Sequence, residues 1–95
     1  MKSYYVYILA SKRNGILYIG VTSNLIKRVY EHKNVLVDGF SRKYKTKLLV
    51  YYEETTSIES AILREKQMKK WKREWKINHI EEINSNWKDL YKDLI

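Results

Sequence analysis

Two apolar runs near the start of the chain predict a β-hairpin. Residues 4–9 and 16–21 are rich in β-branched and aromatic side chains, a composition typical of strands. Between them lies Asn14-Gly15, and both residues accept the positive φ angles that a two-residue hairpin turn requires. A third run, residues 48–52, has the same composition. These patterns predict a small three-stranded antiparallel sheet.

Apolar residues at helical spacing follow the hairpin. Between residues 25 and 30 they recur three and four positions apart, and the polar segment Thr22-Ser23-Asn24 before them offers N-cap side chains. We therefore predict a helix over residues 24–33. Residues 34–46 contain a glycine and a cluster of basic side chains, and we expect them to form a loop.

A second helical pattern begins after the polar segment 55–57 and continues to residue 83, so that one long helix and two shorter helices both fit. Residues 85–95 are expected to form a short extra helix or a docked tail. The order β-β-α-β-α-α predicts a small α+β domain over residues 1–84, with helices flanking the sheet.

Composition excludes several classes of site. The chain has 95 residues, enough for a single domain, and it has no cysteine. Disulfides, thiolate zinc sites and cysteine nucleophiles are therefore excluded, and two histidines are too few for a histidine-rich metal site. Because the chain shows neither an apolar signal segment nor a run of membrane-spanning length, we expect a cytoplasmic protein, taken as a monomer.

The net charge of +8 is unevenly distributed. Residues 79–95 contain four acidic side chains and two lysines, so that residues 1–78 carry +10. Such an excess favours a polyanionic partner, because lysine and arginine neutralise phosphates and release counterions. Charge alone leaves the question even, since many basic proteins bind nucleic acid only adventitiously.

A single carboxylate interrupts the apolar face of the second helical pattern. Ile58, Ala61, Ile62 and Met68 define that face, and Glu65 falls near its centre. A carboxylate on an apolar stripe is costly unless it is paired or binds a cation. Spacing alone favours a glutamate paired with lysine or arginine, with a metal ligand at a cleft as the second reading.

Two further groups of side chains have a structural and a chemical interpretation. Arg28 and His32 lie one helical turn apart, as part of a solvated face or as a cationic pair that faces a phosphate. Tyr5 and Tyr7 share one face of the first strand, and Tyr18 lies on the second. Packing is the usual role of strand tyrosines, but phenols beside an arginine, a histidine and a carboxylate would form a hydrolytic site.

The hairpin resembles the paired signature of the GIY-YIG nuclease family. Its two parts are Tyr5-Val6-Tyr7 and, after ten intervening residues, Tyr18-Ile19-Gly20. Arg28 follows Tyr18 by ten residues, where the family places its catalytic arginine, and His32 comes one turn later, as in several members.

The likeness extends into the second helical pattern. Residues 61–69 resemble the helix that bears the metal-binding glutamate of the family, with Glu65 in its place. The similarity covers roughly residues 3–84 and is strongest to the small single-domain bacterial branch. It implies the GIY-YIG fold.

The chain departs from the family pattern at three points. Tyr5 and Val6 replace the glycine and isoleucine of the first triplet, a change that suits a strand. Val21 stands where some members have a lysine that helps to activate the base. An asparagine that is important in some members has two weak matches, Asn84 and Asn86.

The resemblance implies a role for each candidate catalytic residue. Tyr7 or Tyr18 would take a proton from water, although a phenol with an ordinary pKa of about 10 needs a nearby cation to lower it. Arg28 would stabilise charge on the phosphoryl oxygens, and His32 would relay a proton or contact the phosphate. Glu65 would hold one divalent ion, Mg²⁺ or Mn²⁺, completed by waters and substrate oxygens.

Basic residues outside this set are candidate nucleic-acid contacts. They are Arg42, Lys43, Lys45, Lys66, Lys69, Lys70, Lys72 and Arg73. Trp71 and Trp75 are interleaved with the later ones, and we expect both to pack into the core rather than to stack on bases.

The resemblance implies a metal-dependent endonuclease that hydrolyses phosphodiester bonds, in DNA rather than RNA, in repair or recombination. A non-catalytic nucleic-acid-binding module on the same fold is the first alternative. A protein-interaction domain, with a partner surface of tyrosines and tryptophans, is the second.

Overall fold

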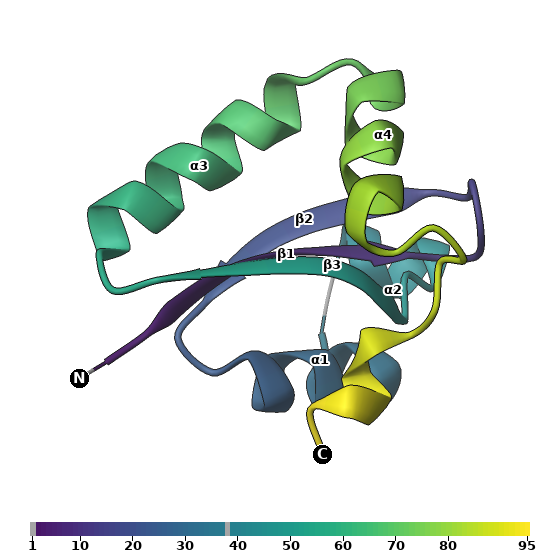
Figure 1. The fold of residues 1–95 in the computed structure, drawn as a ribbon. Coiled ribbons are helices and arrows are strands. Elements are labelled where there is room, and N and C mark those ends of the chain that lie inside the picture. The colour runs from purple at the N-terminus through teal and green to yellow at the C-terminus, as the bar shows by residue number, and fades with distance from the viewer. Residues whose placement is uncertain (1, 38) are drawn as a thin grey trace.

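The structure, a computed structural model, describes residues 2–37 and 39–95. The elements are, in chain order, β1 (Tyr4–Ala10), β2 (Leu17–Thr22), α1 (Leu25–Lys33), α2 (Phe40–Tyr44), β3 (Leu48–Thr55), α3 (Ile58–Lys70), α4 (Arg73–Ile83) and η1 (Leu90–Asp93), a short 3₁₀ helix. The described strands form one antiparallel sheet in the order β2-β1-β3, which confirms the predicted α+β class. In Figure 1, α3 and α4 lie on one side of this sheet and α1 and η1 on the other.

Successive side chains of β1 point to opposite faces of the sheet, so the strand contributes to a hydrophobic core on each side. Val6 and Ile8 pack with Met68 of α3 and with α4. Tyr7 and Leu9 pack with α1 on the opposite face. Both cores are almost closed to solvent, so the central strand is held rigidly between them.

Helix α3 buries a narrower face than its apolar pattern predicts. Ala61 and Met68 are fully buried, but Ile58 and Ile62 are 37% and 40% exposed. The prediction that these two isoleucines are buried is therefore wrong, because the sheet meets the helix along the line from Ala61 to Met68. Glu65 lies between those two residues in sequence, on the part of the helix that faces the sheet.

Two features differ from the predicted elements. The predicted loop contains α2, which begins after Gly39, a residue with φ of 85°, and is followed by the C-cap residue Lys45, with φ of 55°. The last helical pattern forms two helices, since Trp71 is extended, with φ of −63° and ψ of 147°. The side chain of Trp71 packs against the core between them, which fixes the direction of α4.

The C-terminal segment docks against the sheet. Trp87 is buried, and Asp89 pairs with Lys33 and accepts a hydrogen bond of 3.2 Å from the Leu49 amide. The side-chain amide of Asn84 donates a hydrogen bond of 3.0 Å to the Val50 carbonyl, which ties the end of α4 to β3. In the described parts of the chain no helix is both long enough and apolar enough to cross a bilayer.

Candidate active site

The hydroxyl of Tyr7 reaches across the edge strand of the sheet. Tyr7 on central strand β1 is directly opposite Gly20 on β2. A Cβ atom on Gly20 would lie 2.5 Å from the Tyr7 hydroxyl oxygen, a distance that real Cβ atoms do not adopt. The glycine of the second signature triplet therefore leaves the space that the phenol occupies.

A chain of hydrogen bonds holds this phenol. Its hydroxyl is 3.2 Å from His32 Nε2, and His32 Nδ1 is 2.7 Å from the Ser41 hydroxyl on α2. Ser41 in turn donates to the Thr46 carbonyl, which can only accept. In the tautomer in which Ser41 accepts from Nδ1–H, His32 Nε2 accepts the proton of Tyr7.

Arg28 is the permanent cation of the group. Its guanidinium pairs with Glu31 over 3.1 Å and lies close enough to the Tyr7 hydroxyl to act against the rise in the pKa of that phenol. Arg28 and His32 do not form the cationic pair suggested by their spacing. Burial, followed by the charge of Arg28, lowers the pKa of His32 to about 4, so the imidazole is neutral at pH 7.

The phenol of Tyr7 also differs from expectation. Burial, followed by the neighbouring phenol of Tyr18, raises the pKa of Tyr7 to about 12, although Arg28 acts in the opposite direction. The expected lowering by a nearby cation is therefore outweighed by desolvation. Tyr7 remains protonated at neutral pH.

Tyr18 joins the same group from β2. Its ring centroid lies 6.3 Å from that of Tyr7 and 5.1 Å from that of His32. Tyr18 is half-buried, whereas Tyr7 is only 1% exposed. Of the two phenols, Tyr18 is the one that solvent reaches.

Glu65 approaches from the opposite face of the sheet, because α3 and α1 lie on different sides (Figure 1). On one flank of α3, Arg64 pairs with Glu53 of β3. On the other flank, Lys69 lines a hollow together with Tyr18 of β2. Glu65 lies one turn before Lys69, over the β2 edge, and its charge is close enough to contribute to the raised pKa of Tyr7, after burial and Tyr18.

The carboxylate of Glu65 has a partner in the protein. It pairs with Lys69 Nζ over 3.2 Å, and its side chain is 15% exposed. This is the paired arrangement that spacing alone favours. Lys69 is 54% exposed, and such an exposed partner is easily displaced by a stronger cation.

Glu65 offers a divalent ion a single carboxylate from the protein. No group of three or more His, Asp or Glu side chains gathers into a metal cluster within residues 2–37 and 39–95. His32 is not available as a ligand because both of its ring nitrogens are engaged. One carboxylate oxygen donor fits a hard ion such as Mg²⁺, which keeps several waters and binds through few protein ligands.

The predicted nucleic-acid contacts are all exposed, but they are not equivalent. Arg73 donates to the carbonyls of Asn14 and Gly15, so it ties α4 to the hairpin turn. Lys69 is engaged with Glu65. The expectation for the tryptophans holds for Trp71, which packs on the core, and is wrong for Trp75, which is 55% exposed.

Ser41 and Thr46 are the residues of this site that the sequence pattern does not reveal. Both are buried polar residues in the segment predicted as a loop. The spacing of Phe40 and Tyr44, one helical turn apart, is the local signal that identifies α2.

Comparison with known proteins agrees with this geometry. The chain matches the family described as the GIY-YIG catalytic domain over residues 3–78. A UPF0213 protein of Staphylococcus haemolyticus is 34% identical over 82 residues, which cover 86% of this chain and 99% of that protein. A UPF0213 protein of Staphylococcus saprophyticus is 30% identical with the same coverage.

A solved structure shares the fold. The solution NMR structure of a UPF0213 protein from Bacillus halodurans matches with a TM-score of 0.57 and 24% identity, over 95% of both chains. The family match spans most of the described chain, and the signature tyrosines, Arg28 and His32 meet at one edge of the sheet. The chain therefore belongs to the GIY-YIG family, a family of nucleases.

Proposed function

We propose that the protein is a metal-dependent endonuclease that hydrolyses phosphodiester bonds in nucleic acid. The observation that carries the proposal is the meeting of two phenols, a guanidinium and a histidine at the β2 edge, with the Glu65 carboxylate approaching from α3. The preference for DNA over RNA and a role in DNA repair or recombination stay predictions.

Arg28 supplies the positive charge for the phosphoryl oxygens. Hydrolysis concentrates negative charge on those oxygens, and a guanidinium donates several hydrogen bonds in a fixed geometry without losing its proton. Its present ion-pair partner is Glu31, which is exposed enough to be displaced by a phosphate. Arg28 is therefore the first candidate for transition-state stabilisation.

Tyr7 and His32 together accept the proton of the attacking water. A phenolate is not available, because the pKa of Tyr7 is about 12. The Tyr7 oxygen, which is almost closed to solvent in the free protein, instead takes a proton from a water that the bound substrate holds against it, while its own proton passes to His32 Nε2 along the existing hydrogen bond. A bound phosphate opposes the effect of Arg28 on His32 and favours the protonated imidazole during this transfer.

The hydrolysis needs no reactant other than water. The water oxygen bonds to phosphorus, the phosphorus–oxygen bond to the leaving strand breaks, and that oxygen takes a proton from solvent. His32, which is buried, then returns its proton to Tyr7, and the Tyr7 hydroxyl releases a proton to solvent as the product leaves. A divalent ion held by Glu65 would offset negative charge on the phosphate oxygens. Tyr18, the accessible phenol, contacts the substrate.

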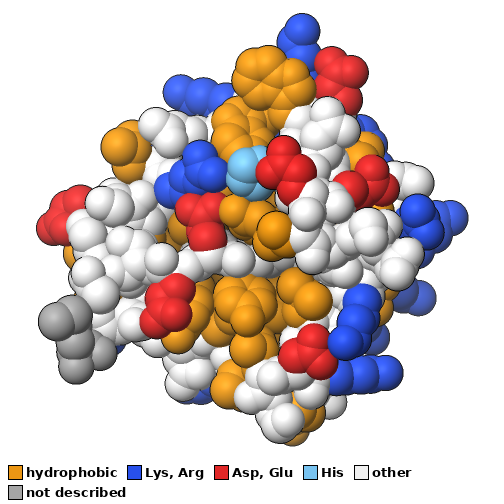
Figure 2. Space-filling model, viewed as in Figure 1, with side chains coloured by type: hydrophobic (Ala, Val, Ile, Leu, Met, Phe, Trp, Pro, Cys, Tyr) orange, Lys and Arg blue, Asp and Glu red, His pale blue; other side chains and the backbone are white. Residues whose placement is uncertain are grey.

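Exposed lysines near α3 supply further attraction for the nucleic-acid backbone. Lys66, Lys70 and Lys72 are all exposed. The face seen in Figure 2 carries acidic side chains among hydrophobic ones, with lysines and arginines mostly along its outline. That face is therefore a poor surface for a polyanion.

A plasmid nicking assay tests the proposal. The wild-type protein should convert supercoiled DNA to the open circle with Mg²⁺ or Mn²⁺ and not in EDTA. Glu65→Gln and Arg28→Ala should lose at least about 100-fold in rate, the effect typical of removing one charge-stabilising group, while filter binding to the same DNA is retained. Gln67→Ala, at an exposed uncharged residue of the same helix, is the matched control.

The same assay separates the alternatives. Cutting by both variants at the wild-type rate would exclude the assigned site. Salt-dependent binding without cleavage of DNA or RNA under any metal condition would instead support the non-catalytic binding module.

A further inference from the structure

A hollow of about 280 Å³ lies beside the candidate active site. Tyr18 of β2 and Phe40 of α2 line it, and Lys69 and Lys76 come to it from the other side of the sheet. Its volume is just under the range of about 300–1,000 Å³ that is usual for whole small-molecule ligands. The hollow therefore suits a flat fragment such as a single nucleobase.

Phe40 gives the hollow an exposed aromatic wall. It is 47% exposed and lies nearly parallel to Tyr18, with ring centroids 6.2 Å apart and an interplanar angle of 29°. Tyr44 supports it from behind, at a centroid distance of 4.6 Å. A supported aromatic ring that stays open to water is the arrangement by which proteins stack bases of single strands.

The two lysines give the hollow the charge of a nucleotide site. Lys69 is the ion-pair partner of Glu65, so the hollow borders on the proposed metal ligand. If Glu65 binds a cation, Lys69 becomes available to a phosphate. Lys76 hydrogen-bonds to the backbone carbonyl of Lys69 over 3.3 Å, which holds the second ammonium at the last turn of α3.

We propose that this hollow binds one unpaired nucleobase next to the scissile phosphate, so that the substrate class is nucleic acid with a single-stranded segment at the cut. The proposal rests on the proposed nuclease function. A base within a duplex is covered on both faces by its neighbours, and taking it out costs unstacking and unpairing energy. A single strand, flap or gap presents such a base without that cost.

Binding without cleavage tests the site. A single-stranded oligonucleotide with a central 2-aminopurine, whose fluorescence falls on stacking, is titrated with the protein in EDTA, and its duplex serves as the reference. The wild-type protein should bind the single strand more tightly and quench it. Phe40→Ala should weaken single-strand binding by about tenfold and reduce the quenching, and leave duplex binding unchanged.

Two variants control for structure. Phe40→Trp keeps an aromatic face and should keep the affinity, and Leu36→Ala removes an exposed apolar side chain outside the hollow and should change neither substrate. Thermal unfolding of each variant verifies that it is folded. Equal binding of single strand and duplex, with no effect of Phe40→Ala, would overturn the proposal.

The outcome is separable from that of the nicking assay. Phe40-dependent single-strand binding in a protein that cuts no substrate would uphold the base site and remove the nuclease function. Cleavage of fully paired DNA at equal rates by wild type and Phe40→Ala would uphold the nuclease function and overturn the base site.

Discussion

Two clusters on opposite edges of the sheet contain the same four kinds of side chain. The β2-edge cluster consists of Tyr7, Arg28 and His32, together with Glu65 of α3 on the opposite face of the sheet. The β3-edge cluster consists of Tyr51, Glu53, Arg64 and His79. Burial first, and then a neighbouring group, raises the pKa of each tyrosine to about 12. The two clusters differ in which charges are paired with each other.

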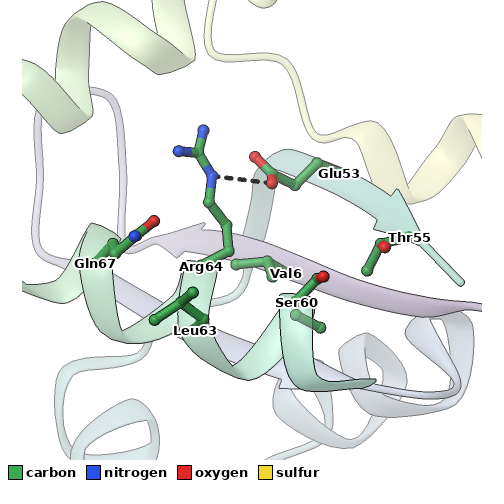
Figure 3. A pocket seen from close by; sticks show the side chains of 8 residues that line it. Val6, Glu53, Thr55, Ser60, Leu63, Arg64 and Gln67 are labelled. Carbon is green, nitrogen blue, oxygen red and sulfur yellow. Dashed lines mark hydrogen bonds and ion pairs between the residues drawn. The ribbon is translucent and has the colours of Figure 1, made fainter. Parts of the chain in front are cut away.

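The β3-edge cluster is closed. Arg64 Nε donates to Glu53 over 3.0 Å, and the same guanidinium lies 3.2 Å from His79 Nε2. Tyr51 donates to Glu53 as well. Figure 3 shows the Arg64–Glu53 pair at the pocket of about 290 Å³ between α3 and β3. Guanidinium and carboxylate neutralise each other there, so the cluster fastens α3 to the sheet.

The β2-edge cluster is open. Arg28 pairs with Glu31 on its own helix, and Glu65 pairs with the exposed Lys69 on its own helix. The guanidinium and the carboxylate of this cluster therefore do not neutralise each other. Each can exchange its present partner for a substrate or a cation. Composition does not distinguish the two edges. The pairing of the charges does, and four predictions use this difference.

Separate replacement of Arg28 and of Arg64 by alanine should give the largest difference between the two clusters. Arg28→Ala should lower the cleavage rate by at least about 100-fold because it removes the charge aimed at the phosphate, with little change in stability. Arg64→Ala should keep the rate and lower the free energy of unfolding by about 1 kcal/mol, since it breaks a half-exposed ion pair. Single-turnover kinetics and urea unfolding measure both. The reverse pattern would contradict the division into open and closed clusters.

Acid should destabilise the protein through His32. The pKa of this side chain is about 4 in the folded protein and about 6.5 when unfolded, so between these values only the unfolded chain binds the proton. The free energy of unfolding should therefore fall by roughly 3 kcal/mol as pH drops from 6.5 to 4, and this contribution should not grow further below pH 4. Urea unfolding across this range measures the slope.

Two histidine variants show which side chain causes the dependence of the free energy of unfolding on pH. His32→Gln should remove the part due to His32, whereas His79→Gln, in the β3-edge cluster, should retain it. A slope that survives His32→Gln would show that other groups cause the acid sensitivity.

Gly20→Ala should disturb the β2-edge cluster alone. The added methyl group would lie 2.5 Å from the Tyr7 hydroxyl oxygen and must push the phenol away from His32. We expect a loss of stability of about 1–3 kcal/mol, as for overpacking, together with a loss of cleavage. Gly20→Ala combined with Tyr7→Phe should not regain the lost stability, because the ring carbon Cζ, which phenylalanine retains, would still lie 2.6 Å from the added methyl group. Wild-type stability of Gly20→Ala would be inconsistent with this packing.

Lys69→Met should have the smallest effect. Removal of the partner of Glu65 should lower the Mg²⁺ concentration for half-maximal cleavage by about 1.5- to 5-fold, which corresponds to an exposed ion pair. Lys70→Met, on the same helix, should leave the metal requirement unchanged. An unchanged requirement in Lys69→Met would mean that this lysine does not compete with the metal ion.

Local patterns in the sequence determined the elements and the family. Asn14-Gly15 between two apolar runs specifies the hairpin, and the N-cap residues Asn24 and Ser57 locate the starts of α1 and α3, because these signals act within a few residues. The spacing of the signature tyrosines and Arg28 on those elements is also local, so the family could be identified before any coordinates.

Contacts between distant residues decided the rest. His32 is neutral because packing buries it beside Tyr7, 25 residues away, and Ser41. Arg64, and not Arg28, neutralises a strand carboxylate, because Arg64 lies on the flank of α3 that faces β3. Burial and electrostatic pairing are properties of packed neighbours, and neighbours far apart in the chain are set only by the tertiary structure.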